Sequence, residues 1–205
     1  MKMEIIKNGF TIVDCIQGSA EWHAARMGVI TGSRFTAVIS GGKARPAYMT
    51  SLVNEIVYGQ REERYTNNAM LEGTNREPLA RYRYSKLFNV DVQEVGFVQM
   101  CSRVGVSPDG LVGENGLIEI KCPLEKAFNS YSANPKKLVS AYKWQVQGQL
   151  WVTDRKWCDM FAWRPESEKD YVCVRVFRNE KDIKVLSAGV DQFIKELNVK
   201  LNEDW

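Results

Sequence analysis

Between Ser107 and Pro123 the chain reads Ser107-Pro-Asp-Gly-Leu-Val-Gly-Glu-Asn-Gly-Leu-Ile-Glu-Ile-Lys-Cys-Pro123. Within this segment, Gly113-Glu-Asn-Gly116 is typical of a turn. Arg103–Ser107 before the turn and Leu117–Cys122 after it are rich in β-branched side chains and predict two strands. The turn therefore returns the chain antiparallel to itself, as part of a β-sheet.

The strand after the turn carries charge on one face. Side chains alternate along a strand, so Glu119 and Lys121 share one face while Ile118 and Ile120 share the other. The antiparallel return can bring Asp109 beside Glu119. Two carboxylates and an ammonium are costly to bury without compensation, and a divalent cation with a phosphate resolves that cost. These three residues are therefore candidates for metal-dependent phosphodiester hydrolysis.

A metal ion at this place has a defined chemical role. The carboxylates hold the ion, which polarises a phosphoryl oxygen and acidifies a water, while the lysine orients that water or screens charge. The competing interpretation is a solvated face, because Glu-x-Lys pairs on strands are commonly exposed and short motifs recur by chance. Apolar neighbours favour a central strand instead, namely Leu117, Ile118, Ile120 and Pro123.

The composition limits the chemistry further. One histidine, His23, in 205 residues argues against Ser-His-Asp catalysis and against multi-histidine metal sites. Oxygen ligands then remain for a metal, and they suit Mg²⁺, Mn²⁺ or Ca²⁺. The five cysteines lack a CxxC pair and are expected to be reduced thiols, and the net charge of +3 allows a basic groove without requiring one. Without a long apolar run or a signal peptide, we expect a cytoplasmic protein and no membrane contact.

The other elements are predicted from hydrophobic periodicity and capping residues. Helices are expected from Ser19 to Arg26, from Thr31 or Ser33 to Gly41, from Pro46 to Gly59, over 69–88 with a kink or internal start at Pro78, over 137–153, and after Asn179. Further strands are expected over 90–100, 157–163 and 171–177. Because no repeat, linker or low-complexity tract occurs, residues 1–205 are expected to form a single nuclease domain. The fold class is α/β (α+β), with a central mixed β-sheet flanked by helices.

Four more polar residues fit the same centre. Glu77 belongs to the helix upstream of the sheet, and its alternative is a surface glutamate near a helix end. Tyr142, Gln145 and Gln149 recur at i, i+3 and i+7, and so form one polar stripe on the helix predicted over 137–153. Surface glutamines are common, but a polar stripe on an otherwise apolar helix favours a contact with substrate.

These residues, in this order, resemble the bacteriophage lambda exonuclease family of phage-type alkaline exonucleases, within the PD-(D/E)xK nuclease superfamily. The similarity spans nearly the whole chain. Its motifs are Glu21-Trp-His-Ala-Ala-Arg26, Gly28-Val-Ile-Thr-Gly-Ser33, Gly73-x-x-x-Glu77, Ser107-Pro-Asp-Gly110, Glu119-Ile-Lys-Cys-Pro123, Tyr142-x-x-Gln-Val-Gln147 and Trp151-Val-Thr153. Several ordered motifs together are specific, whereas any one alone is weak. The resemblance implies a restriction-endonuclease-like core.

The resemblance also implies roles for the catalytic residues. Asp109 and Glu119 are implied to be metal ligands, with the main-chain carbonyl of Ile120 as a third contact. Lys121 is implied to be the catalytic lysine, and Glu77 to support the metal-site network. The implied cofactor is Mg²⁺, for which Mn²⁺ can substitute.

The remaining matched residues are implied to contact DNA. Gln145 is implied to lie near the scissile phosphate, and Tyr142 and Trp22 to bind substrate. Arg26 and Ser33 match the family's 5′-phosphate pocket, which agrees with the forked donors of arginine and the free N–H groups of a helix N-terminus. The alternatives are an Arg26 that satisfies helix C-terminal carbonyls and a Trp22 that belongs to the core.

The family further implies a ring-shaped homotrimer threaded by DNA in the cytoplasm of a bacterial host. It implies 5′-to-3′ digestion of one strand of linear double-stranded DNA to mononucleotides, and a 3′ single-stranded tail for a single-strand annealing protein. Pro78 departs locally from the pattern, because the residue before a proline, here Glu77, is steered away from helical dihedrals. Three alternatives stay open: an endonuclease or repair nuclease of the same superfamily, a DNA-binding module without activity, and a hydrolase of small phosphate esters.

Overall fold

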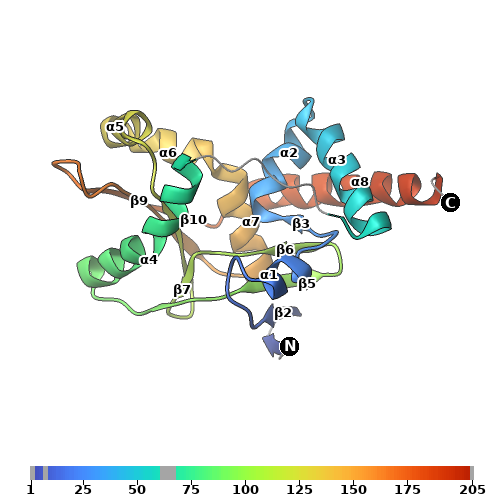
Figure 1. Cartoon of the computed structure of the whole chain (residues 1–205), viewed down its shortest axis with the longest axis horizontal. Helices are drawn as coiled ribbons and strands as arrows, with labels where there is room; N and C mark the ends of the chain where they lie inside the picture. The colour runs from blue at the N-terminus through green and yellow to red at the C-terminus, as the bar shows by residue number, and fades with distance from the viewer. Residues whose placement is uncertain (1–2, 7–8, 61–67, 204–205) are drawn as a thin grey trace.

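The computed structural model describes residues 3–6, 9–60 and 68–203, which form helices around two β-sheets (Figure 1). The strands are β1 (Met3–Ile6), β2 (Phe10–Val13), β3 (Ile30–Thr31), β4 (Val92–Gln93), β5 (Phe97–Cys101), β6 (Val104–Val106), β7 (Gly110–Val112), β8 (Gly116–Lys121), β9 (Trp157–Trp163) and β10 (Tyr171–Phe177). The helices are α1 (Ala20–Ala25), the 3-10 helix η1 (Gly32–Arg34), α2 (Phe35–Ser40), α3 (Ala44–Tyr58), α4 (Asn68–Phe88), α5 (Glu125–Ala133), α6 (Pro135–Ala141), α7 (Lys143–Thr153) and α8 (Glu180–Glu203).

The predicted central sheet is divided into two mixed sheets of five strands each. Their strand orders are β1-β2-β5-β6-β3 and β10-β9-β8-β7-β4. Among the described pairs, β3 with β6 and β8 with β9 run parallel, and the others run antiparallel. Long helical connections separate the partners of both parallel pairs, as parallel pairing requires. The predicted α/β class with mixed pairing is confirmed, in two sheets instead of one.

The strand predicted over 90–100 is where the two sheets separate. Its first part, β4, pairs with β7, and its second part, β5, pairs with β2 and β6. Gly96 lies between the two parts, where a Cβ atom would approach the carbonyl oxygen of Cys15 to 2.2 Å. Only glycine allows the two segments of main chain to approach so closely. One long apolar run is therefore two short strands in different sheets.

The turn over 113–116 is confirmed, but a different strand precedes it. β7 pairs antiparallel with β8 across this turn, whereas the strand predicted over 103–107 is β6 and belongs to the other sheet. β7 has only three residues, too few to give a periodic signal. The antiparallel return to β8 is nevertheless present, and it begins directly after Asp109.

β8 is a central strand, as its apolar residues predicted. Its first five residues are buried and only Lys121 is partly exposed. Leu117 belongs to the large core cluster that includes Val146 and Leu150 of α7. Ile118 and Ile120, on the other face, belong to a second cluster with α4. The strand with the predicted catalytic charges therefore lies between two helices and two apolar clusters.

Most predicted helix ends are confirmed. The Ser19 hydroxyl accepts a hydrogen bond of 3.3 Å from Trp22 N–H at the start of α1, and Asn179 caps α8 through the N–H groups of Lys181 and Asp182. The second predicted helix begins as η1 before α2, and Thr31 precedes it without a side-chain cap. α2, α3 and α8 pack together at one end of the molecule, and α4 lies at the other end (Figure 1).

Two predicted helices differ in the structure, and α5 (Glu125–Ala133) was not predicted. The helix predicted over 137–153 is broken at Tyr142, which has φ −119° and ψ 16° and separates α6 from α7. α4 continues through Pro78 without an internal start. Within the described part of the chain, every helix is too short or too polar to span a membrane.

Candidate active site

Asp109 is attached to β8 through its side chain. Its Oδ2 accepts a hydrogen bond of 2.5 Å from the main-chain N–H of Ile120. The antiparallel register places Gly110 opposite Ile118, so that the preceding residue, Asp109, lies beside Glu119. The sequence predicted this neighbourhood from the turn, and the structure contains it.

The Glu119 carboxylate is 1% exposed and accepts hydrogen bonds on both oxygens. Its Oε1 accepts from Lys121 Nζ and from Gln145 Nε2, each at 2.5 Å. Its Oε2 accepts from Gln149 Nε2 at 2.6 Å. The predicted polar stripe of α7 therefore faces the predicted catalytic residues of β8.

Lys121 is a charged residue in this arrangement. Its ammonium contacts Glu119 and lies 4.6 Å from the centroid of the Tyr142 ring. Burial lowers the pKa of Lys121, but the charges of Glu119 and Asp109 outweigh burial and raise the pKa above its ordinary value. A charged lysine at this place can hold or screen a phosphate oxygen. The next residue, Cys122, has its pKa raised by burial to about 12, so its thiol is protonated.

Glu77 reaches the same region from α4. Its Oε1 accepts a hydrogen bond of 2.6 Å from Arg81, one turn later in the helix. Burial raises the pKa of the Glu77 carboxyl, Arg81 opposes the rise, and the charge of Glu119 adds to it. The proline after Glu77 therefore does not turn this carboxylate away from the other two.

The crowding of carboxylates fits a divalent cation. Burial raises the pKa of Asp109 well above its usual range, and the charges of Glu119 and Glu77 add to the rise. Two carboxylates and the carbonyl of Ile120 are the hard oxygen donors that Mg²⁺ prefers. The described residues contain no group of three or more His, Cys, Asp or Glu side chains arranged to hold a metal. Main-chain and water oxygens would have to complete the coordination.

The segment Ser107–Asp109, which joins the two sheets, is held by three different elements. The indole N–H of Trp22 on α1 donates to the Ser107 hydroxyl at 2.9 Å. Gln17 Nε2, in the loop before α1, donates to the carbonyls of Pro108 and Val95, both at 2.9 Å. Arg81 Nε on α4 donates to the Asp109 carbonyl at 2.9 Å. We call this arrangement the three-point support of Asp109.

A cleft runs past these residues in two parts that meet at Thr74 and Glu77. The larger part has a volume of about 940 Å³ and is lined by Asp109, Arg81 and the segment from Asp14 to His23, including Trp22. The smaller part, of about 440 Å³, is lined by Ile120, Lys121 and Tyr142. Most of the predicted catalytic residues therefore lie along one continuous cleft.

Of the two residues predicted to bind the 5′-phosphate, Arg26 packs against Trp22, which lines the larger part of the cleft. The Arg26 guanidinium packs 3.7 Å from the centroid of the Trp22 ring and the residue is 7% exposed. Ser33 is exposed on η1 and lines neither part of the cleft. The structure thus brings Arg26 and Trp22 together and does not bring Ser33 against them.

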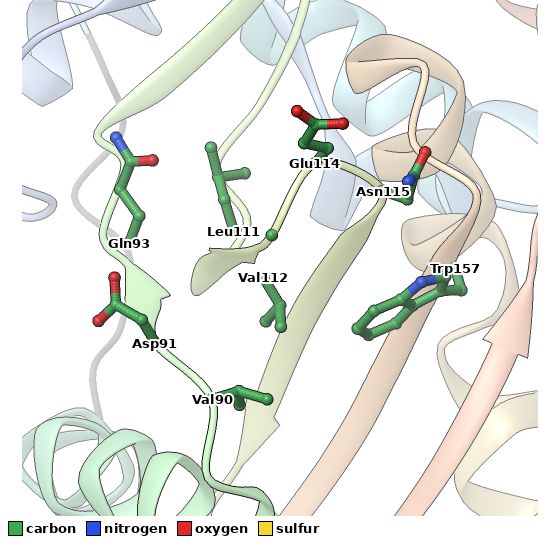
Figure 2. A pocket seen from close by; sticks show the side chains of 9 residues that line it. Val90, Asp91, Gln93, Leu111, Val112, Glu114, Asn115 and Trp157 are labelled. Carbon is green, nitrogen blue, oxygen red and sulfur yellow. The ribbon is translucent and has the colours of Figure 1, made fainter.

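Another hollow, of about 620 Å³, lies at the β4 edge of the second sheet. Figure 2 shows the side chains around it. It is lined by Val90, Asp91, Gln93, Leu111, Val112, Gly113, Glu114, Asn115 and Trp157. Its two charged side chains, Asp91 and Glu114, are acidic and would repel a phosphate. None of the predicted site residues lines it, so the cleft at Asp109 remains the candidate active site.

Residues 21–156 match the family model of the YqaJ-like viral recombinase domain. This range contains every predicted site residue. The chain belongs to the YqaJ-like viral recombinase family. Comparison with curated protein sequences gives no match.

Solved structures of exonucleases resemble this member of the family. The crystal structure of the alkaline exonuclease LHK-Exo from Laribacter hongkongensis is 34% identical, with a TM-score of 0.82, over 90% of this chain and 95% of that chain. The structure of LHK-Exo in complex with dAMP is 35% identical, with a TM-score of 0.84 and the same coverage. A phage-related exonuclease from Haemophilus somnus 129PT is 14% identical with a TM-score of 0.70, over 86% and 96% of the two chains, and shows the fold alone.

The comparisons confirm the resemblance to the bacteriophage lambda exonuclease family and the restriction-endonuclease-like fold. They support a nuclease role for this chain, in a family whose members usually use divalent metals. Sequence reasoning missed two residues of the site. Arg81 follows Glu77 at i+4, a spacing that predicts an ion pair on a helix. Gln17 contacts Pro108, 91 positions away, and no local pattern predicts it.

Proposed function

We propose that this chain is a Mg²⁺-dependent exonuclease that degrades one strand of linear double-stranded DNA in the 5′-to-3′ direction. The products would be mononucleotides and a duplex with a 3′ single-stranded tail. The observation that carries the proposal is the convergence of Asp109, Lys121 and Glu77 on one cleft beside β8, with the buried Glu119 in contact with Lys121 behind it. The complex of the relative LHK-Exo with dAMP supports DNA as the substrate, since dAMP is a deoxynucleoside monophosphate.

Each residue of the cleft has a proposed role. Asp109, Glu119 and the Ile120 carbonyl would hold Mg²⁺, for which Mn²⁺ can substitute. When bound, the ion supplies Lewis-acid activation of the phosphodiester and of a water. Lys121 would hold a phosphate oxygen with its charged ammonium, and Glu77 would add negative charge beside the ion.

The remaining residues would position DNA. Gln145, half-buried beside Glu119, would lie near the scissile phosphate, and Tyr142 would line the path of the strand. Trp22 lines the other end of the cleft, where its indole and the guanidinium of Arg26 would receive the 5′ end. Ser33 would contribute a hydroxyl to the 5′-phosphate from η1.

A single incubation tests the proposed activity. The purified protein is mixed with Mg²⁺ and either linear or covalently closed duplex DNA, with parallel samples in excess EDTA. Mononucleotides from linear DNA alone, abolished by EDTA, support a metal-dependent exonuclease. Nicked circles would show an endonuclease instead, and the absence of products from both substrates would show a binding module. Full digestion in EDTA would contradict the metal mechanism.

Direction and setting complete the proposal. Linear duplex labelled at one 5′ end should release the labelled nucleotide first, whereas a 3′ label should persist in the single-stranded product. We propose a homotrimer that acts in the bacterial cytoplasm and passes the 3′ tail to a single-strand annealing protein. These assignments rest on the family.

A further inference from the structure

Gln149 occupies an unusual position for a polar side chain. It is 1% exposed, lies on α7 behind Glu119, and donates through Nε2 to Glu119 Oε2 at 2.6 Å. Its own Oε1 is buried and has no hydrogen-bond partner among the described residues. The opposite orientation of the amide would place its oxygen against the carboxylate oxygen. Burying an amide oxygen without a partner is costly. The hydrogen bond from Nε2 to Glu119 is therefore the contact for which this side chain is retained.

The two oxygens of Glu119 have different surroundings. Oε1 contacts Lys121 and Gln145, both of which are partly exposed, and Lys121 lines the cleft. Among the described residues, the hydrogen bond to Oε2 comes from Gln149 alone, which is buried on α7. An ion that enters from the cleft can therefore replace the contacts of Oε1 but cannot easily replace that of Oε2.

We propose that Gln149 is a positioning residue that restricts Glu119 to one-oxygen coordination and thereby sets the preference of the site for Mg²⁺ over Ca²⁺. This inference rests on the proposed function, in which Glu119 is a metal ligand. Gln149 itself is buried and lines neither part of the cleft.

The chemistry of the two ions explains the preference. Mg²⁺ is small, requires nearly octahedral geometry and is commonly bound through one or two carboxylates with several waters. Ca²⁺ accepts six to eight oxygens and often takes both oxygens of one carboxylate. When a buried amide already holds one oxygen of a carboxylate, the other oxygen is still available to Mg²⁺. Ca²⁺ then has one oxygen ligand fewer. Removal of the amide should therefore improve Ca²⁺ binding relative to Mg²⁺.

The experiment is a calorimetric titration of the DNA-free protein with Mg²⁺ and, separately, with Ca²⁺. Gln149→Met keeps the volume of the side chain and removes the donor, and Gln149→Asn keeps an amide that is one methylene too short to reach Glu119. The expected result for both is a fall of roughly tenfold in the ratio of Mg²⁺ to Ca²⁺ affinity, the size expected for one lost hydrogen bond to a charged group.

The matched control is Gln147→Met, two positions away on α7. Gln147 is also buried and hydrogen-bonded, but to the Phe177 carbonyl and the Asn179 N–H and not to Glu119. This variant should keep the wild-type ratio, and thermal melts should show that all three variants are folded.

The outcomes separate the inference from the function on which it rests. Folded Gln149 variants with the wild-type ratio would overturn the role of Gln149 while leaving the metal site intact. A fall of the ratio in Gln147→Met as large as in Gln149→Met would also overturn it, because any disturbance of α7 would then suffice. A wild-type protein that binds neither ion would overturn the proposed metal mechanism itself.

Discussion

Arg81 donates to Glu77 at 2.6 Å from one turn further along α4, although Pro78 lies between them. The same guanidinium donates to the main-chain carbonyl of Asp109 at 2.9 Å. One cation therefore fixes one carboxylate through its side chain and another through its backbone. The proline does not disturb this arrangement, because α4 remains helical on both sides of it.

The first prediction concerns this cation. Arg81→Met should lower the rate of hydrolysis by roughly tenfold, the effect of losing a charge-assisted hydrogen bond. Arg81 opposes the rise in the pKa of Glu77, so its loss should raise that pKa further and move the acidic limb of the pH–rate profile to higher pH. Arg81→Lys should shift the limb less. An unchanged limb in a folded Arg81→Met protein would show that the contact is structural only.

The second prediction concerns the centre itself. Asp109→Ala, Glu119→Ala and Lys121→Ala should each reduce hydrolysis by at least about 10²–10³-fold, the range for loss of one preorganised electrostatic group. Glu114→Ala, at the exposed turn, should retain wild-type activity. Initial rates on linear duplex at saturating Mg²⁺ provide the measurement. Substantial activity in any of the three variants would remove that residue from the centre.

The third prediction concerns stability without metal. The folded pKa values of Asp109 and Glu77 are raised above their ordinary values of 3.8 and 4.5. Their contribution to stability is therefore complete below about pH 4 and is lost as the pH rises through the raised values. In Asp109→Asn the side chain still accepts the hydrogen bond from the Ile120 N–H but carries no charge. At pH 8 without metal this variant should therefore melt higher than wild type. The expected difference is about 2–4 °C for each kcal/mol of unfolding free energy gained by removing the charge.

Differential scanning calorimetry at pH 4 and pH 8 measures this difference. The advantage of Asp109→Asn should be small at pH 4, where the wild-type carboxyl is protonated. Added Mg²⁺ should raise the melting temperature of wild type at pH 8 more than that of the variant. A wild type that melts higher than Asp109→Asn in EDTA at pH 8 would contradict the proposed crowding.

The fourth prediction concerns the DNA end. Hydrolysis leaves a new 5′ phosphate on the remaining strand, so wild type should digest 5′-phosphorylated ends faster than 5′-hydroxyl ends. Arg26→Ala should remove most of this preference, because a charge-assisted contact contributes about 1.5–3 kcal/mol. Arg83→Ala is the control. It removes an arginine of α4 that pairs with Asp170, and it should keep the preference. Equal wild-type rates on both ends would show that Arg26 only supports Trp22.

The fifth prediction concerns assembly. If the trimer of the family carries over, light scattering should give three times the 23.4 kDa chain mass. Digestion of long duplex should then be processive, measured by challenge with excess unlabelled DNA after the reaction starts. A monomer that stays processive under this challenge would contradict the ring.

Local patterns predicted much of the fold and of the site. The alternation of charge along β8 placed Glu119 and Lys121 on one face, and the structure joins them by a contact of 2.5 Å. β9 and β10 have the predicted bounds because each is a full-length apolar strand flanked by turn residues. The helical spacing of Gln145 and Gln149 indicated a shared face, and both contact Glu119.

The predictions were wrong where an element depends on contacts between residues far apart in the sequence. The division of the sheet depends on Gly96 approaching Cys15, a residue 81 positions away, so the run over 90–100 looks like one strand in sequence. Short strands such as β7 have no measurable period. The break at Tyr142 separates two runs that are both helical by composition, and the role of Gln17 follows only from the tertiary fold.

The three-point support of Asp109 has a consequence for communication across the cleft. Trp22 belongs to the region proposed to receive the DNA end, and its indole holds Ser107, two residues before a proposed metal ligand. A displacement of Trp22 by an arriving strand would therefore be transmitted through two peptide units to Asp109, while Gln17 and Arg81 limit its size. If the proposed roles of Trp22 and Asp109 hold, end recognition and metal geometry would be linked through Ser107, and substitutions that alter which ends are accepted should also alter how tightly the ion is held.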